Sequence, residues 1–288
     1  MKVPSNQISE LYRFYQKRLS GFYPDQEAKS LLLKLIWHYF GISRMSMAVD
    51  PGYRLNESEL LQLHFAVEEL EKFRPIQYVL GFEMFGDLRF EVDSNVLIPR
   101  PETLQLVSVL TEFLSSKKFP RLLDIGTGSG CIAISLAKSI PEAEVFALDI
   151  STEALQCARR NADAHQMKIH FIEADILEMP EAVLSDQFHA FVSNPPYVTN
   201  SEKHLIQPNV LNYEPHTALF VPDDDPLIFY RSIVKLAQKK LIKNGMLAFE
   251  INEKFGGEVR NLLTNTGFNQ VEVLKDINGK DRFVTGLR

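Results

Sequence analysis

Four consecutive residues, Asn194-Pro195-Pro196-Tyr197, combine the stiffness and the polar groups needed to bind a planar group that carries N–H bonds. They follow the apolar run 188–193, which predicts a buried strand. Each proline fixes its own φ and keeps the preceding residue out of the helical region, so the carbonyls of this stiff segment are free to accept hydrogen bonds. The Asn194 side chain adds one acceptor oxygen and two donors, and Tyr197 adds a ring. The tetrapeptide predicts a clamp for a carboxamide or an exocyclic base amine; taken alone, it leaves open a proline-rich turn without function.

A glycine-rich turn is the second candidate for chemistry, because it lies between the predicted strand 122–125 and the predicted helix 131–138. Its residues are Gly126, Thr127, Gly128, Ser129 and Gly130. Glycines at such a turn let a ligand approach the backbone, and the start of the helix adds free N–H groups. The spacing is Gly-x-Gly-x-Gly and not the Gly-x-Gly-x-x-Gly of dinucleotide sites. Asp124 directly before the turn would repel a pyrophosphate, so the pattern favours a cationic ligand or one with an ammonium group.

Two acidic residues follow the next predicted strands. Asp149 lies about twenty residues beyond the glycines, where an acid accepts hydrogen bonds from ribose hydroxyls in nucleoside-binding α/β folds. Asp175 is placed to meet an adenine amine, and Ile176 the adenine face. Each acid alone is equally well explained as a helix cap or a surface charge. With the glycine turn and Asn194, however, they give four polar positions at the carboxyl edge of one parallel sheet, which is where ligands bind in such folds.

The elements that must position these residues form an α/β domain preceded by helices. Residues 1–72 carry apolar residues at helical spacing and a cap at 56–59, which predicts a small helical bundle for docking a substrate protein. Residues 73–99 predict a hairpin linker with short strands 78–81, 84–86 and 88–92. Residues 100–288 alternate strands and helices, the signature of a mainly parallel sheet. The predicted strands are 122–125, 145–149, 169–173, 188–193, 246–251, 271–274 and 283–286.

Composition restricts the class of protein. The 288 residues, 45% hydrophobic and 24% charged, are typical of a globular chain with two domains. Apolar runs are too short for a membrane span and the polar start lacks a signal-peptide core, so we expect a cytoplasmic protein. Cys131 and Cys157 form no Cys-x-x-Cys pair and the histidines are scattered, so neither a disulfide nor a metal site is expected. The net charge of −6 argues against nonspecific binding to nucleic acid. We also expect a monomer.

Together these motifs resemble class I S-adenosyl-L-methionine-dependent methyltransferases that act on amide or amine nitrogen. More narrowly, the chain resembles the protein-(glutamine-N5) methyltransferases of peptide chain release factors over nearly its whole length. The motifs that narrow the resemblance are Arg74-Pro75-Ile76-Gln77-Tyr78 with Gly81, Ile98-Pro99-Arg100-Pro101-Glu102-Thr103, Tyr213-Glu214-Pro215 with Ala218-Leu219, and Lys275-Asp276 with Gly279-Lys280-Asp281-Arg282. The chain departs from the pattern at Ile176, where relatives often carry an aromatic residue.

The resemblance implies a Rossmann-like, seven-stranded domain that transfers the cofactor's methyl group to the glutamine of a Gly-Gly-Gln loop, leaving S-adenosyl-L-homocysteine. It implies that Asp149 holds the ribose and that the glycine turn passes near the methionine part of the cofactor. Asn194 and the Pro195 carbonyl would each accept an N–H of the substrate amide, with Tyr197 packed beside it. Arg100 and Glu102 either shape the mouth of the site or form a structural ion pair.

Two alternatives share the tetrapeptide. One is a glutamine methyltransferase that acts on a ribosomal protein and differs in its N-terminal part. The other is an adenine-N6 methyltransferase of nucleic acid, against which the acidic charge balance and the lack of an evident DNA-reading domain both argue.

Overall fold

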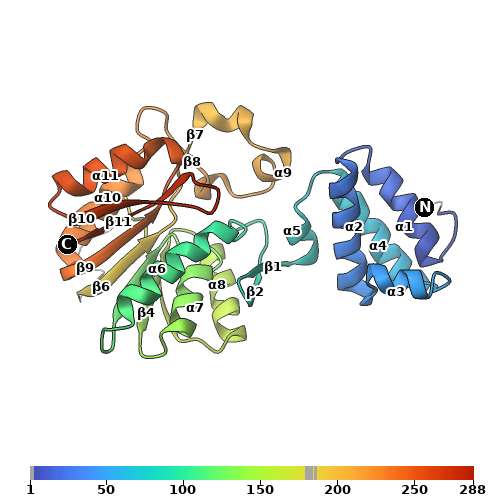
Figure 1. Ribbon diagram of the computed structural model, residues 1–288, viewed down its shortest axis with the longest axis horizontal. Coiled ribbons are helices and arrows are strands. Elements are labelled where there is room, and N and C mark those ends of the chain that lie inside the picture. Colours follow the sequence, from blue (N-terminus) through green and yellow to red (C-terminus); the bar gives the residue numbers. More distant parts are fainter. Residues whose placement is uncertain (1–2, 179–183, 185–186) are drawn as a thin grey trace. The chain divides into compact units, whose positions relative to one another are not determined.

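The computed structural model describes residues 3–178, 184 and 187–288, and the chain divides into two compact units (Figure 1). The helical unit comprises Met1–Gly81 and Gln207–Tyr213, and the sheet unit comprises Phe82–Ile206 and Glu214–Arg288. The sequence predicts a bundle that ends at residue 72 and a separate linker 73–99. In the structure the chain passes between the units after Gly81, so residues 73–81 belong to the helical unit and 82–99 to the sheet unit.

The helical unit has the amphipathic helices expected from its apolar spacing. Its helices are α1 (Ile8–Leu19), α2 (Asp25–Phe40), α3 (Arg44–Val49), α4 (Glu57–Glu71), α5 (Ile76–Leu80) and α9 (Pro208–Leu211). The inward faces of α1, α2 and α4 form one core, in which Leu11, Tyr15, Leu32 and Leu63 are fully buried. The predicted cap before α4 is confirmed as a capping box, because the Asn56 side chain accepts from the Glu59 N–H and the Glu59 carboxylate accepts from the Asn56 N–H.

The predicted strand at 78–81 is wrong, because these residues form and terminate helix α5. Pro75 supplies a fixed φ at the start of the helix, and Gly81 ends it in the left-handed region with φ +79°, its N–H donating to the Gln77 carbonyl. Ile76 and Tyr78, two residues apart, are both buried. Four apolar residues before a glycine are compatible with a strand or with one helical turn, and the alternation of such a short run does not distinguish them.

The sheet unit contains a seven-stranded sheet in the order β10-β11-β9-β6-β3-β4-β5. Strands β3 to β6 and β9 pair in parallel, and β11 runs antiparallel between β9 and β10. The strands are β3 (Arg121–Ile125), β4 (Glu144–Asp149), β5 (Ile169–Glu173), β6 (Phe188–Ser193), β9 (Leu241–Glu250), β10 (Asn269–Lys275) and β11 (Asp281–Leu287). All seven predicted strands are therefore confirmed, as is the predicted α/β architecture with a mainly parallel sheet.

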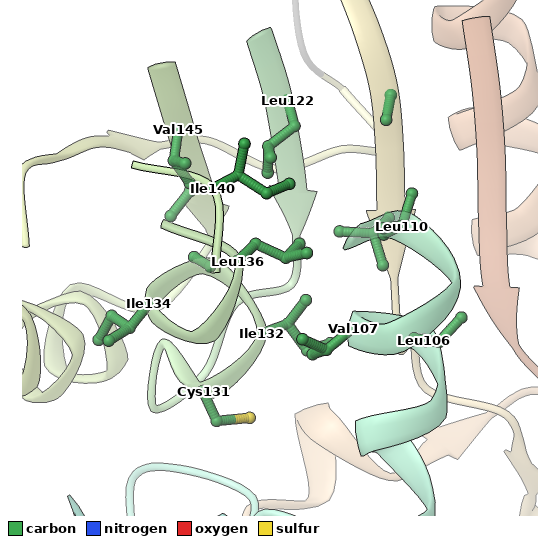
Figure 2. Packing of buried hydrophobic residues seen from close by; sticks show 14 of the residues in the cluster. Leu106, Val107, Leu110, Leu122, Cys131, Ile132, Ile134, Leu136, Ile140 and Val145 are labelled. Atoms are coloured by element: carbon green, nitrogen blue, oxygen red, sulfur yellow. The ribbon is translucent and has the colours of Figure 1, made fainter. Parts of the chain in front are cut away.

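Helices cover both faces of this sheet (Figure 1). They are α6 (Leu104–Leu114), α7 (Cys131–Ser139), α8 (Thr152–Ala164), α10 (Ile228–Lys240) and α11 (Gly256–Asn265). Figure 2 shows Leu106, Val107 and Leu110 of α6 beside Ile132 and Leu136 of α7, over one face of the sheet. On the other face α10 and α11 bury their own apolar side chains against alternate residues of the same strands. Burial on both faces explains the near-continuous apolar runs of the parallel strands.

Short elements complete the sheet unit. The expected hairpin is present as β1 (Phe82–Phe85) and β2 (Leu88–Glu91), and a second pair is β7 (Val198–Thr199) with β8 (Phe220–Val221). The 3₁₀ turns are η1 (Pro101–Thr103), η3 (Asn200–Leu205), η4 (His216–Ala218) and η5 (Glu253–Phe255). Pro101 occupies the first turn that leads into α6, as its sequence position predicts. Among the helices of the described residues, none combines the length and the apolar character that a membrane crossing requires.

Candidate active site

A cavity of about 350 Å³ lies where β3, β4, β5 and β6 end, within the size range of small-molecule sites. Most of the residues singled out in the sequence line it. These are Arg100, Gly126, Thr127, Gly128, Ser129, Asp149, Asp175, Ile176, Asn194, Pro195 and Pro196. Gly130 and Tyr197 are not among the described residues that line the cavity. The carboxyl ends of four strands that lie far apart in the sequence thus converge on one space.

The glycine turn is held open toward this cavity. Gly126 and Gly128 have φ values of +74° and +55°, and a Cβ at either residue would meet no protein atom within 4 Å. The N–H groups of Gly126 and Thr127 both donate to the Leu148 carbonyl at the end of β4. Gly130 has another role: a Cβ there would lie 3.0 Å from the Ile134 side chain, so this glycine permits close packing behind the turn.

Asp149 connects the end of β4 with the glycine turn. Its Oδ2 accepts from the Gly128 N–H at 2.8 Å, and its Oδ1 accepts from the Ser151 N–H at 3.0 Å. Burial raises the pKa of this carboxyl, although these backbone donors oppose the shift. Because each carboxylate oxygen can accept a second hydrogen bond, Asp149 keeps acceptor capacity toward the cavity.

Asp175 and Ile176 follow β5 on the same edge. The Asp175 Oδ1 accepts from the Leu177 N–H at 2.8 Å, which closes a local turn. Ile176 lines the cavity and packs against the core beneath α10. The pair gives this wall a carboxylate next to an aliphatic surface.

The Asn194–Tyr197 turn is fixed at its start by Ser193, whose Oγ donates to the Ile125 carbonyl at 2.7 Å. This bond joins the ends of β6 and β3 and sets the turn beside the glycine turn. Asn194 lines the cavity, and its side chain has no hydrogen-bond partner among the described residues. Tyr197 instead directs its hydroxyl to the Glu250 carboxylate, 3.2 Å away. The packing of its ring beside a substrate amide stays a prediction.

Arg100 both lines the cavity and forms an ion pair. Its Nη2 donates to the Glu214 Oε1 at 2.7 Å, and the Ile98 N–H donates to the Glu214 Oε2 at 3.1 Å. Glu214 is only 3% exposed, so these two hydrogen bonds replace the water that its carboxylate loses on burial. The partner of Arg100 is therefore Glu214, 114 residues further along the chain, while Glu102 does not line the cavity.

Asp124 faces the turn and not the cavity. It is fully buried, and its Oδ2 accepts from the Thr127 hydroxyl at 2.7 Å and from the Ala133 N–H at 3.2 Å. Its Oδ1 has no partner in the described residues. Burial raises the pKa of Asp124 to about 7. This carboxyl thus shapes the glycine turn from behind, whereas the sequence favoured direct contact with a cationic ligand.

The raised pKa of Asp124 predicts a pH-dependent stability. Between about pH 4 and pH 7 the folded state binds more protons at this carboxyl than the unfolded state, so its contribution to the free energy of unfolding falls as pH rises. Asp124→Asn keeps a side-chain acceptor but cannot ionise. Urea denaturation should therefore show the variant gaining stability relative to the parent chain from pH 5 to pH 8, on the order of a few kcal/mol. A constant difference across this range would contradict the prediction.

Asn161 of α8 is a site-forming residue that the sequence reasoning missed. Its Nδ2 donates to the Ser129 carbonyl at 2.9 Å and to the Glu91 carbonyl at 3.0 Å, and its Oδ1 accepts from the Glu91 N–H at 2.7 Å. This buried side chain thus ties the glycine turn to the end of the β1–β2 hairpin. The sequence does contain a sign of this role, because Asn161 is a polar residue on the buried face of an amphipathic helix.

Replacing Asn161 with Ala should destabilise the fold and loosen the glycine turn. The change removes the Asn161 hydrogen bonds to the Glu91 N–H and the Ser129 carbonyl, and one such unsatisfied buried group costs about 1–3 kcal/mol. The Glu91 carbonyl keeps only its contact with the Cys157 thiol. We expect a lower urea midpoint together with weaker cofactor binding by calorimetry. Asp163→Ala is the control, because Asp163 is exposed on the same helix. Equal stability of the two variants would refute the anchoring role of Asn161.

A further part of the cavity wall was also missed. It comes from residues after Glu214 and from α10, namely Pro215, Thr217, Ala218, Phe220, Phe229 and Ile233. Only Pro215 and Ala218 belonged to motifs noted in the sequence. Among the described residues, no group of three or more His, Cys, Asp or Glu is arranged to hold a metal ion.

Curated relatives match the chain along nearly its whole length. The release factor glutamine methyltransferase of Flavobacterium psychrophilum is 44% identical over 273 residues, which are 94% of this chain and 95% of the relative. That of Bacteroides thetaiotaomicron is 39% identical over 281 residues, which are 98% and 100% of the two chains. The chain belongs to the release factor glutamine methyltransferase family. Residues 10–81 match the PrmC N-terminal domain, and residues 105–212 match the Methyltransferase small domain.

A solved structure supports the fold. The delta-N METTL16 MTase domain superposes with a TM-score of 0.54 at 18% identity, covering 76% of this chain and 97% of that domain. At this identity the match supports the fold alone. Together with the strand order, it confirms the Rossmann-like methyltransferase architecture expected from the sequence.

Proposed function

We propose that this protein transfers the methyl group of S-adenosyl-L-methionine to the side-chain nitrogen of the glutamine in the Gly-Gly-Gln motif of peptide chain release factors. Membership in the release factor glutamine methyltransferase family supports this proposal. The observation that carries it is the position of Asn194, which lines the same cavity as the glycine turn and Asp149 and whose side chain has no partner among the described residues.

The cavity fits the cofactor. Gly126 and Gly128 leave open space where a Cβ would stand, so the methionine part can approach their backbone. Asp149 retains acceptor capacity for the two ribose hydroxyls. Asp175 offers a carboxylate toward the adenine amine, beside the aliphatic Ile176. When bound, the cofactor supplies an electrophilic methyl group on a positively charged sulfur.

The protein must orient a poor nucleophile, because the lone pair of an amide nitrogen is delocalised into its carbonyl. We assign the Asn194 side-chain oxygen and the Pro195 carbonyl as acceptors for the two N–H bonds of the glutamine amide. Two fixed acceptors set the rotation of the amide group, which contributes mainly through orientation. They also stabilise the positive charge that develops on the nitrogen as it is alkylated. The alkylated amide is acidic enough to lose its proton to water.

The substrate is tested by incubating the protein with cofactor carrying a labelled methyl group and a purified release factor. Peptide mapping should find the label on the glutamine of Gly-Gly-Gln. A release factor with that glutamine replaced by asparagine is the matched control and should stay unlabelled. Label on a ribosomal protein or on DNA in parallel reactions, with none on the release factor, would overturn the proposal in favour of one of the two alternatives.

A further inference from the structure

Glu250 is a buried acid beside the cavity that the proposed reaction does not use. It is the last residue of β9 and is 2% exposed. Its Oε2 accepts from the Thr103 hydroxyl at 2.6 Å, and its Oε1 accepts from the Tyr197 hydroxyl at 3.2 Å. A buried carboxyl is costly unless hydrogen bonds satisfy it, so these two contacts are required partners of Glu250.

The two partners of Glu250 come from two different segments of the site. Thr103 itself lines the cavity, three residues after Arg100. Tyr197 closes the turn that carries Asn194 and Pro195. The Glu250 carboxylate therefore connects the two segments, which are 94 positions apart in the chain (197 minus 103).

The position of Glu250 follows from the register of the sheet. Ser193 of β6 pairs with Phe249 of the neighbouring strand β9. Glu250 follows Phe249 and Asn194 follows Ser193, so the register brings Glu250 next to the start of the tetrapeptide. The start of the tetrapeptide is fixed by Ser193, and its end is fixed by the Tyr197 hydroxyl on Glu250 and by the Asn252 Nδ2, which donates to the Tyr197 carbonyl at 3.2 Å. Asn194 and Pro195 lie between these two anchors.

We propose that Glu250 is a positioning residue for methyl transfer: through Tyr197 and Thr103 it fixes the spacing between the Asn194–Pro195 acceptors and the cavity wall that carries Arg100. This inference rests on the proposed function. Glu250 is not among the described residues that line the cavity, so it holds the turn and does not itself touch the substrate amide. A fixed turn matters because small displacements of aligned groups reduce the rate of transfer strongly.

Charged and titratable groups from several elements face this carboxyl. Burial raises the pKa of Glu250, whereas Arg282 and the two hydroxyl donors oppose the shift and Glu102 adds to it. Arg282 is itself held by Asp276, at 3.3 Å. Asp276 and Arg282, both from the C-terminal motif noted in the sequence, therefore support the carboxyl of Glu250.

The test compares Glu250→Gln, Tyr197→Phe and the double variant with the full-length protein. A glutamine side chain has one acceptor oxygen in place of the two that accept from the Thr103 and Tyr197 hydroxyls. Glu250→Gln should therefore loosen the turn and lower kcat for a release factor by about tenfold. Its affinity for the cofactor should stay unchanged by calorimetry, because the glycine turn and Asp149 do not contact Glu250. Adding Tyr197→Phe to Glu250→Gln should cost almost nothing further, since the hydroxyl acts through the carboxylate.

Tyr230→Phe is the matched control. The Tyr230 hydroxyl donates to the backbone carbonyl of Glu250 at 3.1 Å, so this variant removes a buried phenol oxygen without altering the carboxylate contacts. Its effect should add to that of Glu250→Gln. A kcat equal to that of the parent chain in Glu250→Gln, or additive effects of Glu250→Gln and Tyr197→Phe, would overturn the inference.

Amide hydrogen exchange supplies a readout independent of activity. Exchange at Tyr197, Val198 and Thr199 should quicken in both Glu250→Gln and Tyr197→Phe and stay constant in Tyr230→Phe. Unchanged exchange in Glu250→Gln would refute the inference whatever the activity. A parent chain that labels no release factor, yet shows the predicted exchange pattern, would refute the proposed function and leave the anchoring of the turn supported.

Discussion

Asn194→Ala is expected to reduce methyl transfer by about a hundred- to a thousandfold, the usual loss when one preorganised polar group at a reacting centre is removed. Asn194 lines the cavity and its side chain has no partner among the described residues, so its removal leaves no internal group unsatisfied. Cofactor affinity should change little, because the glycine turn and Asp149 remain. Single-turnover methyl transfer to a release factor and calorimetry with the cofactor would measure the two effects separately.

Asn265→Ala is the control for this variant, because Asn265 is exposed at the end of α11 and outside the cavity lining. It should leave both measurements unchanged. Equal losses of cofactor binding and turnover in Asn194→Ala would mean that Asn194 serves the cofactor and not the substrate amide. That outcome would remove the basis of the proposed acceptor pair.

Asp149→Ala is expected to weaken cofactor binding by about ten- to a hundredfold, which corresponds to the loss of hydrogen bonds to a charged group. The substitution removes two roles of the Asp149 carboxylate at once. The carboxylate keeps acceptor capacity for the ribose, and it holds the Gly128 N–H of the turn at 2.8 Å. Turnover at saturating cofactor should fall much less, since Asn194 and Pro195 are untouched. Calorimetry and the cofactor dependence of the rate would show the separation.

Glu173→Ala provides a control matched in chemistry and register. Glu173 pairs with Asp149 across β4 and β5, ends its own strand, and accepts from the Thr152 hydroxyl, yet it lies outside the cavity lining. Its loss should leave cofactor affinity unchanged. If Asp149→Ala bound the cofactor as tightly as Glu173→Ala, the ribose assignment would have to be abandoned.

The elements that carry the site were predictable because they depend on local patterns. The apolar runs ending at Ile125, Asp149, Glu173 and Ser193 are each a strand's length, and all four are strands of one sheet. Once the strands are parallel, their carboxyl ends share an edge, and the residues that follow them must converge. The wrong strand at 78–81 was predicted because this apolar segment is too short to show whether its spacing is that of a helix or of a strand. Gly81, which caps helix α5, was interpreted as the turn that ends a strand.

The partners of the charged side chains were not predictable in this way. Arg100 pairs with Glu214, and Glu250 takes Thr103 and Tyr197, across separations of 114, 147 and 53 residues. A carboxylate's partner depends on which distant segments the folded chain places within hydrogen-bond distance of it. Local propensity carries no information about such distances.

By itself, the sequence determined the α/β architecture, the glycine turn and the stiff Asn194–Tyr197 clamp, because periodicity and fixed φ angles are properties of neighbouring residues. The tertiary structure alone decided how the clamp is oriented. It placed Asp124 behind the glycine turn, left the Asn194 side chain without a partner among the described residues at the cavity, and joined the Tyr197 hydroxyl to Glu250. The physical reason is burial: the enclosed carboxyl of Glu250 needs donors, and those that reach it come from segments far apart in the chain. The donors of Asp124 are closer in the chain, at Thr127 and Ala133, but only the fold brings them to its buried carboxyl.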